Sequence, residues 1–585
     1  MLHVQERLQT PAALEPSEHT LTLRDGTELF YRAWLPERPA TKALILFHRG
    51  HEHSGRWQET VAALGLEDVA VFAWDQRGHG HSSGARGSAP DLATVIRDAD
   101  EWVRHLLAEH DIAPQDTIVL AHSLGAVIAT AWVHDYAPPL RGLILATPAF
   151  RVKLYVPFAV PFLRLRQKLL GPSYVTSYVK ANMLTHDAEQ ARRYNADPLI
   201  FREIAVNMLL DLHDTSTRLL DDAAAITVPL LVLAAGSDWV VQQSAQRRFV
   251  ERSSSSIKQF EVLPGFSHAV FHEKDRGRIV EKVRDFILDR FAQPSSSPSL
   301  LDADRQGFTH DEYDRLCGSG GSGFAPLRWL MKGPGRLSRG IHLGWKHGFD
   351  SGIMLDYIYE NRARGVTPLG RLIDRFYLNA IGWRGIRVRR ALLEQTLRST
   401  IEQTHAEGRP VRLLDIASGP GRYILETMAR LRTIPVSAVL RDYKPENREA
   451  AARLRDQLGL AHVVVTAGDA FDRDALAAVT PRPSIALVSG LYELFADNER
   501  VLRSLRGLAD ALEPGGHLLY TNQPWHPQLE FIARVLTNRE GQPWIMRRRT
   551  QAEMDELVRA AGFDKVLQET DPWGIFTVSV ARRVR

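Results

Sequence analysis

The sequence predicts an α/β protein made of two domains, each built around a mostly parallel sheet. Short, wholly apolar segments alternate with helical segments in both halves of the 585-residue chain. This alternation is typical of strands that are covered by helices on both faces. The halves carry different glycine motifs, AHSLG at residues 121–125 and DIASGPG at residues 415–421, and no internal repeat is evident. We therefore expect two different domains, not a duplicated one.

The composition is that of an ordinary globular protein. Hydrophobic residues make up 44% of the chain and charged residues 24%, and 73 Lys+Arg against 69 Asp+Glu leave a net charge of only +4. So small a charge does not indicate a nucleic-acid partner. The single cysteine, Cys317, excludes an internal disulfide and any cysteine-based zinc site, and no metal is expected.

The sequence contains no segment that indicates secretion or membrane insertion. The first twenty residues lack the basic-then-apolar order of a secretion signal. The longest notable apolar stretch, LYVPFAVPFL at residues 154–163, is about half the ~20 residues that a spanning helix requires. These features predict a cytoplasmic protein, and peripheral contact with a membrane stays open.

Two Ser- and Gly-rich segments divide the chain, at residues 292–307 and 318–323. Such sequences cannot bury enough apolar surface to offset the entropy of ordering, so we predict a linker over residues 292–325. The expected domains are then residues 15–291 and 385–585. A helical segment rich in Arg, Tyr and Trp precedes the second domain at residues 326–384.

In the first domain, an Asp-Gly turn at Asp25 predicts a hairpin, and several apolar strands follow it. A helical, Arg-rich interval at about residues 150–222 interrupts the strand rhythm and predicts a cap on the sheet. The expected strands lie at residues 43–47, 69–74, 117–121, 143–146 and 229–235.

The most informative stretch is TIVLAHSLGAVIATAW, in which a strand leads directly into a helix. A sharp turn there lifts Ser123 above the sheet edge, as in the G-x-S-x-G pattern, although Ala121 replaces the first glycine. A serine nucleophile needs a base and an orienting acid, which in this architecture follow in the order acid and then histidine. Asp238 and His268 occupy those places, whereas Asp75 precedes the serine and is a weaker candidate.

Residues 18–290 resemble the serine alpha/beta-hydrolases of the monoacylglycerol lipase, lysophospholipase and serine aminopeptidase S33 group. The motifs HRGHEHSGRW, WDQRGHGHSSG, AHSLG, GSD and GFSH carry this resemblance. It implies an alpha/beta-hydrolase fold with a helical cap, and an oxyanion hole formed by the backbone N–H groups of Gly50 and Leu124. Arg49 stands where the family has glycine, so it could impair the hole or recognise an anionic substrate.

The resemblance also implies hydrolysis of a single-chain lipid ester, such as a monoacylglycerol or a lysophospholipid. A small-molecule esterase and a peptidase-like hydrolase are the alternatives. The cap either contacts lipid aggregates with anionic headgroups or only covers the pocket of the serine site. Its bulky apolar residues are interspersed with Arg151, Lys153, Arg164, Arg166 and Lys168.

In the second domain an acid, Asp415, ends an apolar strand and a glycine turn leads into a helix. Gly419 and Gly421 let the backbone approach a ligand closely. Asp442 ends the next strand, where an acid can accept both ribose hydroxyls. The ends of successive parallel strands form one crevice, and a hairpin is expected to close the sheet near the C-terminus.

From about residue 385 the chain resembles a Rossmann-like, class I S-adenosylmethionine-dependent methyltransferase. The resemblance implies S-adenosyl-L-methionine as cofactor. Its methionine end and sugar would meet Asp415, Ala417, Gly419 and Gly421, its ribose Asp442, and its adenine Asp469 and Ala470. Ser489, Gly490 and Leu491 would border the transferring methyl group.

The methyl acceptor is less well indicated. No Asn-Pro-Pro-aromatic motif is present, which disfavours methylation of the amino group of adenine or glutamine. Tyr492, Glu493, Trp525 and His526 are the candidates for the acceptor wall, with His526 as a base. The preceding Arg- and aromatic-rich helices predict a lid over the donor site.

Together the two domains predict a bifunctional enzyme of lipid metabolism. It would hydrolyse a lipid ester and methylate a small molecule or lipid headgroup. The alternative is one active enzyme whose other domain serves binding or regulation.

Overall fold

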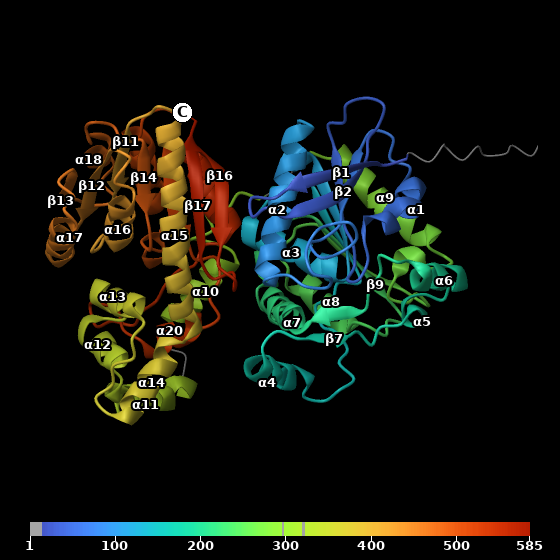
Figure 1. Ribbon diagram of the computed structural model, residues 1–585, viewed down its shortest axis with the longest axis horizontal. Coiled ribbons are helices and arrows are strands. Elements are labelled where there is room, and N and C mark those ends of the chain that lie inside the picture. The colour runs from blue at the N-terminus through green and yellow to red at the C-terminus, as the bar shows by residue number, and fades with distance from the viewer. Residues whose placement is uncertain (1–14, 295–297, 319–321, 585) are drawn as a thin grey trace, which may run out of the picture. The chain divides into compact units, whose positions relative to one another are not determined.

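The computed structural model describes residues 15–294, 298–318 and 322–584, which fall into two compact units that divide between Pro298 and Ser299. Each unit contains one large sheet (Figure 1). No helix among the described residues is both long and apolar enough to cross a bilayer.

Unit 1 is built on an eight-stranded sheet in the order β1-β2-β4-β3-β5-β6-β9-β10. The predicted hairpin is present as the antiparallel pair β1–β2, β2 pairs antiparallel with β4, and the remaining neighbours are parallel. The strands are β1 (Ser17–Thr22), β2 (Glu28–Trp34), β3 (Ala43–Phe47), β4 (Ala70–Trp74), β5 (Thr117–His122), β6 (Gly142–Ala146), β9 (Leu230–Ala235) and β10 (Lys258–Leu263).

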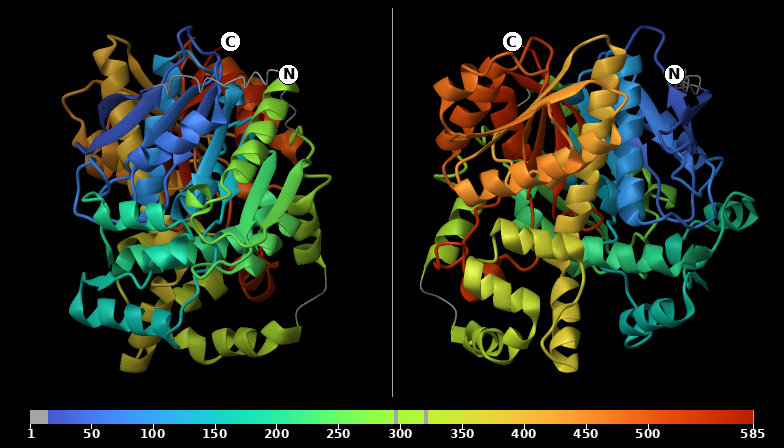
Figure 2. Two further views of the ribbon diagram at one scale, coloured as in Figure 1. Left: turned by 90° about the vertical axis from the view of Figure 1, so that its right-hand side faces the viewer. Right: turned by 60° about the vertical axis from the view of Figure 1, so that its left-hand side comes forward.

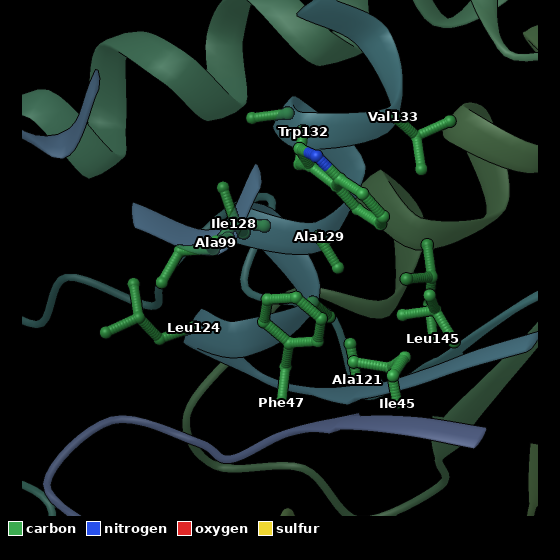
Figure 3. Close-up of a cluster of buried hydrophobic side chains, with 14 of the residues drawn as sticks. Ile45, Phe47, Ala99, Ala121, Leu124, Ile128, Ala129, Trp132, Val133 and Leu145 are labelled. Atoms are coloured by element: carbon green, nitrogen blue, oxygen red, sulfur yellow. The ribbon is translucent and has the colours of Figure 1, made fainter. Parts of the chain in front are cut away.

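Helices cover both faces of this sheet, as the wholly apolar strands predict. Along β3, Ile45 and Phe47 contribute to the core on one face and Leu44 and Leu46 to the core on the other, because side chains alternate along a strand. Figure 3 shows Phe47 packed beneath Trp132 of the helix that follows β5. The helices are α2 (Leu92–Glu109), α3 (Leu124–Tyr136) and α8 (Gln243–Arg252) on the first face, and α1 (Gln58–Leu64) and α9 (Gly277–Ala292) on the second.

The predicted cap forms between β6 and β9 and gathers at one end of the sheet (Figures 1 and 2). It contains a two-stranded sheet of β7 (Tyr174–Thr176) and β8 (Glu203–Ala205). Its helices are α4 (Ala159–Leu170), α5 (Ala181–Leu184), α6 (Ala188–Ala196) and α7 (Val206–Asp221).

Unit 2 is built on a seven-stranded sheet in the order β13-β12-β11-β14-β15-β17-β16. The first five strands of this sheet along the chain are parallel to one another, and the expected closing hairpin is the antiparallel pair β16–β17. The strands are β11 (Val411–Asp415), β12 (Val436–Asp442), β13 (Val463–Ala467), β14 (Ile485–Val488), β15 (His517–Asn522), β16 (Phe563–Thr570) and β17 (Thr577–Arg583). This is the doubly wound, Rossmann-like architecture that the sequence predicts.

The helical segment that precedes this sheet begins at the edge where β11 ends, and its last, long helix continues along the sheet (Figures 1 and 2). It comprises α11 (Ala325–Lys332), α12 (Arg339–His347), α13 (Gly352–Glu360), α14 (Pro368–Leu378) and the long helix α15 (Ile381–Ala406). The predicted division at residue 385 falls inside α15. The other helices of unit 2 are α10 (Phe308–Cys317), α16 (Arg422–Arg430), α17 (Pro445–Leu458), α18 (Arg473–Ala477), α19 (Asn498–Ala511), α20 (Leu529–Val535) and α21 (Gln551–Ala560).

The predicted linker over residues 292–325 needs correction. Residues 295–297 and 319–321 of it lie outside the described residues, but the part between them is folded into unit 2. Leu301 packs against the core of that unit, the α10 residue Leu316 is buried, and Glu312 pairs with Arg548. Apolar and ionic contacts with distant residues thus hold this segment in unit 2, including the helix α10 between the two Ser- and Gly-rich stretches.

Candidate active sites

Ser123 lies at the sharp turn between β5 and α3, as predicted. Its backbone is strained, with φ 56° and ψ −111°, and its N–H donates to the carbonyl of Ala146 at 2.9 Å. The turn brings α3 close to β3, since a Cβ at Gly125 would lie 2.3 Å from the carbonyl oxygen of His48. The residue two places after the serine must therefore be glycine.

The structure brings Ser123, His268 and Asp238 together in a buried chain of hydrogen bonds. His268 Nε2 lies 2.8 Å from Ser123 Oγ, and His268 Nδ1 lies 2.9 Å from Asp238 Oδ2. Because the carboxylate can only accept, Nδ1 carries the proton and Nε2 is left to accept from the serine hydroxyl. This is the geometry of a nucleophile, a base and an orienting acid.

Asp238 is held in place by its own loop. Its Oδ1 accepts hydrogen bonds from the N–H groups of Val240 at 2.7 Å and Val241 at 2.9 Å. Burial alone would raise the pKa of Asp238, but His268 and these two N–H groups keep it below the ordinary value. The rival acid, Asp75, accepts from the backbone of Ser54 and His81, so its carboxylate supports loops instead.

The predicted oxyanion donors lie on neighbouring segments. Leu124 is the first residue of α3, and a Cβ at Gly50 would lie 3.4 Å from its side chain. Arg49, beside them, is buried: its Nη2 donates to Glu52 at 2.6 Å and its guanidinium lies 5.0 Å from the centre of the Tyr194 ring. Burial would raise the pKa of Glu52, but the charge of Arg49 holds this pKa well below its usual range. The arginine charge is therefore neutralised within the protein.

Unit 2 contains a cavity of about 860 Å³ at the carboxyl ends of its parallel strands. All the predicted cofactor residues except Asp415 line it: Ala417, Gly419, Gly421, Asp442, Asp469, Ala470, Ser489, Gly490 and Leu491. Asp415 is fully buried, and it accepts hydrogen bonds from the Tyr423 hydroxyl and from the Ala417 N–H. Burial raises the pKa of Asp415 to about 7.

The two glycines of the turn serve different purposes. Both have positive φ, but a Cβ at Gly419 would meet nothing within 4 Å, whereas one at Gly421 would lie 2.9 Å from Leu440. Gly419 thus leaves open space beside the turn, and Gly421 permits close packing of α16. The Gly419 N–H donates to Asp442 Oδ2 at 2.8 Å, which joins the turn to the end of β12.

Aromatic rings border the end of the cavity near Asp469. The rings of Phe471 and Phe495 lie 4.6 Å apart, and the Arg500 guanidinium lies 4.3 Å from the centre of each. Such a platform suits a flat, nitrogen-containing ring. Sequence reasoning missed Phe495 and Arg500, because they come from the loop and helix after β14.

Two of the four acceptor candidates line the cavity and two do not. Glu493 and His526 line it, whereas Tyr492 points into the core, with its hydroxyl 3.0 Å from Ser504 Oγ. Trp525 packs against a hydrophobic cluster and is likewise not part of the lining. Tyr492 and Trp525 are therefore not wall residues.

The geometry of His526 does not fit the role of a base. Its Nδ1 accepts a hydrogen bond from the Gln528 N–H at 3.0 Å, and burial lowers its pKa to about 4. The neutral ring therefore carries its proton on Nε2, which can only donate. Sequence reasoning also missed Arg389 of α15, which pairs with Glu493 at 3.3 Å and lies over the Phe576 ring.

Two protein families match different parts of the chain. The family described as "Putative methyltransferase" matches residues 283–583, and the family described as "Serine aminopeptidase, S33" matches residues 38–275. The "Monoacylglycerol lipase" of Mycolicibacterium smegmatis is 28% identical over 274 residues, which cover 46% of this chain and 97% of that protein. The crystal structure of the Paleococcus ferrophilus monoacylglycerol lipase is similar at a TM-score of 0.41 and 21% identity, over 45% of this chain and 99% of that one.

One relative extends over both units. The "Uncharacterized protein YnbC" of Escherichia coli (strain K12) is 48% identical over 578 residues, which cover 97% of this chain and 98% of that protein. With half of the chain matched by the methyltransferase family and an S33-type serine hydrolase domain before it, the protein belongs to this methyltransferase family and is a full-length relative of YnbC.

Proposed function

We propose that the chain is a bifunctional enzyme, in which unit 1 hydrolyses the carboxylic ester of a single-chain lipid and unit 2 transfers a methyl group from S-adenosyl-L-methionine. The observation that carries the hydrolase is the chain of hydrogen bonds from Ser123 through His268 to Asp238. The observation that carries the methyltransferase is the cavity lined by the ends of β11, β12, β13 and β14.

In the hydrolase, Ser123 Oγ attacks the ester carbonyl while His268 Nε2 takes its proton. The N–H groups of Leu124 and Gly50 stabilise the oxyanion that forms, and His268 then gives the proton to the departing alcohol. Water then attacks the acyl-serine ester, with His268 again acting first as base and then as acid, and the carboxylic acid is released. Asp238 keeps the imidazole oriented and stabilises its charged form throughout.

The lipid substrate is supported by the surface of the cap. Helix α4 has no buried residue, and Phe158 and Phe162 are 84% and 64% exposed. Leu169 and Leu170 on the same helix are also exposed, and Arg164, Arg166 and Lys168 lie between them. An apolar surface with interspersed cations suits contact with an anionic lipid aggregate. The similarity to proteins named monoacylglycerol lipase and monoglyceride lipase points to the same substrate class.

The lining of unit 2 fits S-adenosyl-L-methionine. Asp442 at the end of β12 would accept the ribose hydroxyls, and Asp469 and Ala470 with the Phe471–Phe495 platform would hold the adenine. The open space beside Gly419 gives room for the sugar and methionine. When bound, the cofactor supplies an electrophilic methyl group, and Ser489, Gly490 and Leu491 border the place where it is transferred.

Two variants of the intact chain test the two activities separately. Ser123→Ala should abolish hydrolysis of medium-chain esters and leave S-adenosylmethionine binding, measured by calorimetry, unchanged. Asp442→Ala should abolish S-adenosylmethionine binding and leave the hydrolysis of medium-chain esters unchanged. If only one activity responds and the other is absent from the wild type, the chain is instead one enzyme with a binding or regulatory module.

A further inference from the structure

The cavity of unit 2 extends well beyond the predicted cofactor residues, into a part that we call the acceptor chamber. Its walls are apolar and come from α15, α20 and the loops near the C-terminus: Trp383, Ile386, Ile532, Leu536, Trp544 and Phe576. The Trp383 and Trp544 rings are stacked, with centres 6.3 Å apart. The whole cavity, at about 860 Å³, lies near the upper end of the range for small-molecule sites, so it has room for a second, apolar molecule beside the cofactor.

The polar groups that line the cavity include two N–H donors, on His526 and Gln523. His526 presents Nε2–H, because its Nδ1 accepts from Gln528. The side-chain Nε2 of Gln523, which also lines the cavity, is buried with no hydrogen-bond partner among the described residues. The buried guanidinium of Arg389, which is paired with Glu493, lies beside Gly490, where a Cβ would lie 3.2 Å from its Nη2.

The carboxylates and the imidazole that line the cavity outside the predicted cofactor residues are mostly committed to other groups. Glu493 pairs with Arg389 at 3.3 Å, Asp350 with Arg539 at 2.8 Å and Asp356 with Arg422 at 3.2 Å, and Glu540 is exposed to solvent. The one imidazole that lines the described cavity, His526, has its acceptor nitrogen already occupied. A hydroxyl acceptor would need a base to become nucleophilic. An acceptor that is already an anion would need none.

We propose that the methyl acceptor is a free carboxylate on a long apolar body, such as a fatty acid; this rests on the proposed methyltransferase function. At neutral pH a carboxylic acid is ionised. Its anion suits the N–H donors of His526 and Gln523, while its chain suits the Trp383–Trp544 walls. A carboxylate oxygen forms a bond to the methyl carbon as the carbon–sulfur bond breaks, and that electron pair stays on sulfur. The anion and the sulfonium yield a neutral methyl ester and a neutral thioether, with no proton transferred.

This acceptor also gives the two units a chemical order. Ester hydrolysis is the class of reaction that releases a fatty carboxylate, and it is the reaction proposed for unit 1. The methyl ester formed by unit 2 is in turn an ester that a serine hydrolase could cleave. The test therefore uses the intact chain carrying Ser123→Ala, so that the product is not removed.

The variant is incubated with S-adenosylmethionine deuterated in its methyl group and with sodium dodecanoate, dodecanol, dodecylamine or lysophosphatidylethanolamine in separate reactions. Deuterated methyl dodecanoate, detected by mass spectrometry, is the expected product. Label in another acceptor but not in dodecanoate, or in none of them although the cofactor binds by calorimetry, overturns the inference. Absence of cofactor binding overturns the proposed function itself and this inference with it.

A binding measurement tests the chamber independently of turnover. Calorimetry of dodecanoate with the protein saturated by S-adenosylhomocysteine should show at least a tenfold loss of affinity in Trp383→Ala. Trp329→Ala is the matched control, because Trp329 lies on α11, is 70% exposed and does not line the cavity. Both variants should bind S-adenosylhomocysteine like the wild type, which shows that they are folded. Equal dodecanoate affinity in the two variants would contradict the placement of the chain.

Discussion

Gly125 lies so close to His48 that a Cβ on the glycine would be 2.3 Å from the histidine carbonyl oxygen. Gly125→Ala should therefore push the start of α3 away from β3 and displace the Leu124 N–H. Loss of one oxyanion donor typically lowers kcat by about 10²–10³, and overpacking costs about 1–3 kcal/mol of stability. Ester hydrolysis and thermal unfolding measure the two effects.

Gly277→Ala is the control for this substitution. It also adds a methyl group to a helical glycine of unit 1, but a Cβ there would meet nothing within 4 Å. Its activity and melting temperature should match those of the wild type. A Gly125→Ala enzyme that is equally active would show that the turn can relax.

Arg49 should matter for stability more than for catalysis. Arg49→Met leaves Glu52 buried, with Arg56 at 3.4 Å as its remaining ion pair. Breaking a buried pair from one side typically costs about 3–5 kcal/mol. Denaturant unfolding should show this loss, and the double variant Arg49→Met/Glu52→Gln should recover most of it. A loss of hydrolysis with unchanged stability would instead place Arg49 in the reaction.

Asp415 should make the stability of the protein depend on pH. Its pKa is raised by burial to about 7, above an unfolded value of about 3.9. A group whose pKa is raised on folding contributes stability that is present below the unfolded pKa and is lost as the pH rises through the folded one. Asp415→Asn has no such proton to lose. The melting temperature of Asp415→Asn minus that of the wild type should therefore increase from pH 5 to pH 8. A difference that stays constant over this range would contradict the raised pKa of Asp415.

The exposed face of α4 should decide binding to lipid surfaces. Phe162→Asp with Leu169→Asp replaces two exposed apolar side chains by charges, so cosedimentation with vesicles containing phosphatidylglycerol should fall by about tenfold or more. Hydrolysis of water-soluble p-nitrophenyl butyrate should not change. The control is Leu288→Asp, on the exposed side of α9 outside the cap. If both variants lose vesicle binding equally, α4 is not the contact surface.

The hydrolase site could be predicted almost completely, because its signal is local. An apolar strand, the turn at Ser123 and a helix follow one another without interruption, and Asp238 and His268 each come just after a strand. The order of these segments then places the three side chains at one sheet edge. What the sequence could not reveal is the contact between Arg49 and the Tyr194 ring, because Tyr194 comes from the distant cap.

The second site was predictable only where strands end. Nearly every cofactor residue predicted from the strand ends lines the cavity, but the acceptor wall depends on which way single residues turn. Tyr492 and Glu493 are adjacent, yet one enters the core and the other the cavity. The protonation of His526 depends on the backbone N–H of Gln528, and Arg389 reaches Glu493 across about a hundred residues of sequence. Such long-range pairings leave no periodic pattern.

Helix α15 is a single 26-residue helix whose last residue, Ala406, is close in sequence to the start of β11. One end of it carries Trp383 and Ile386 of the acceptor chamber, and its next turn carries Arg389 beside Gly490. Residues of the acceptor chamber and a residue beside the proposed methyl-donor site therefore lie on one helix. In evolution, an exchange of the helices before the sheet would therefore also replace part of the proposed methyl-donor site. A change of acceptor specificity would then arise by substitutions within α15 or in the shorter helices that pack against it.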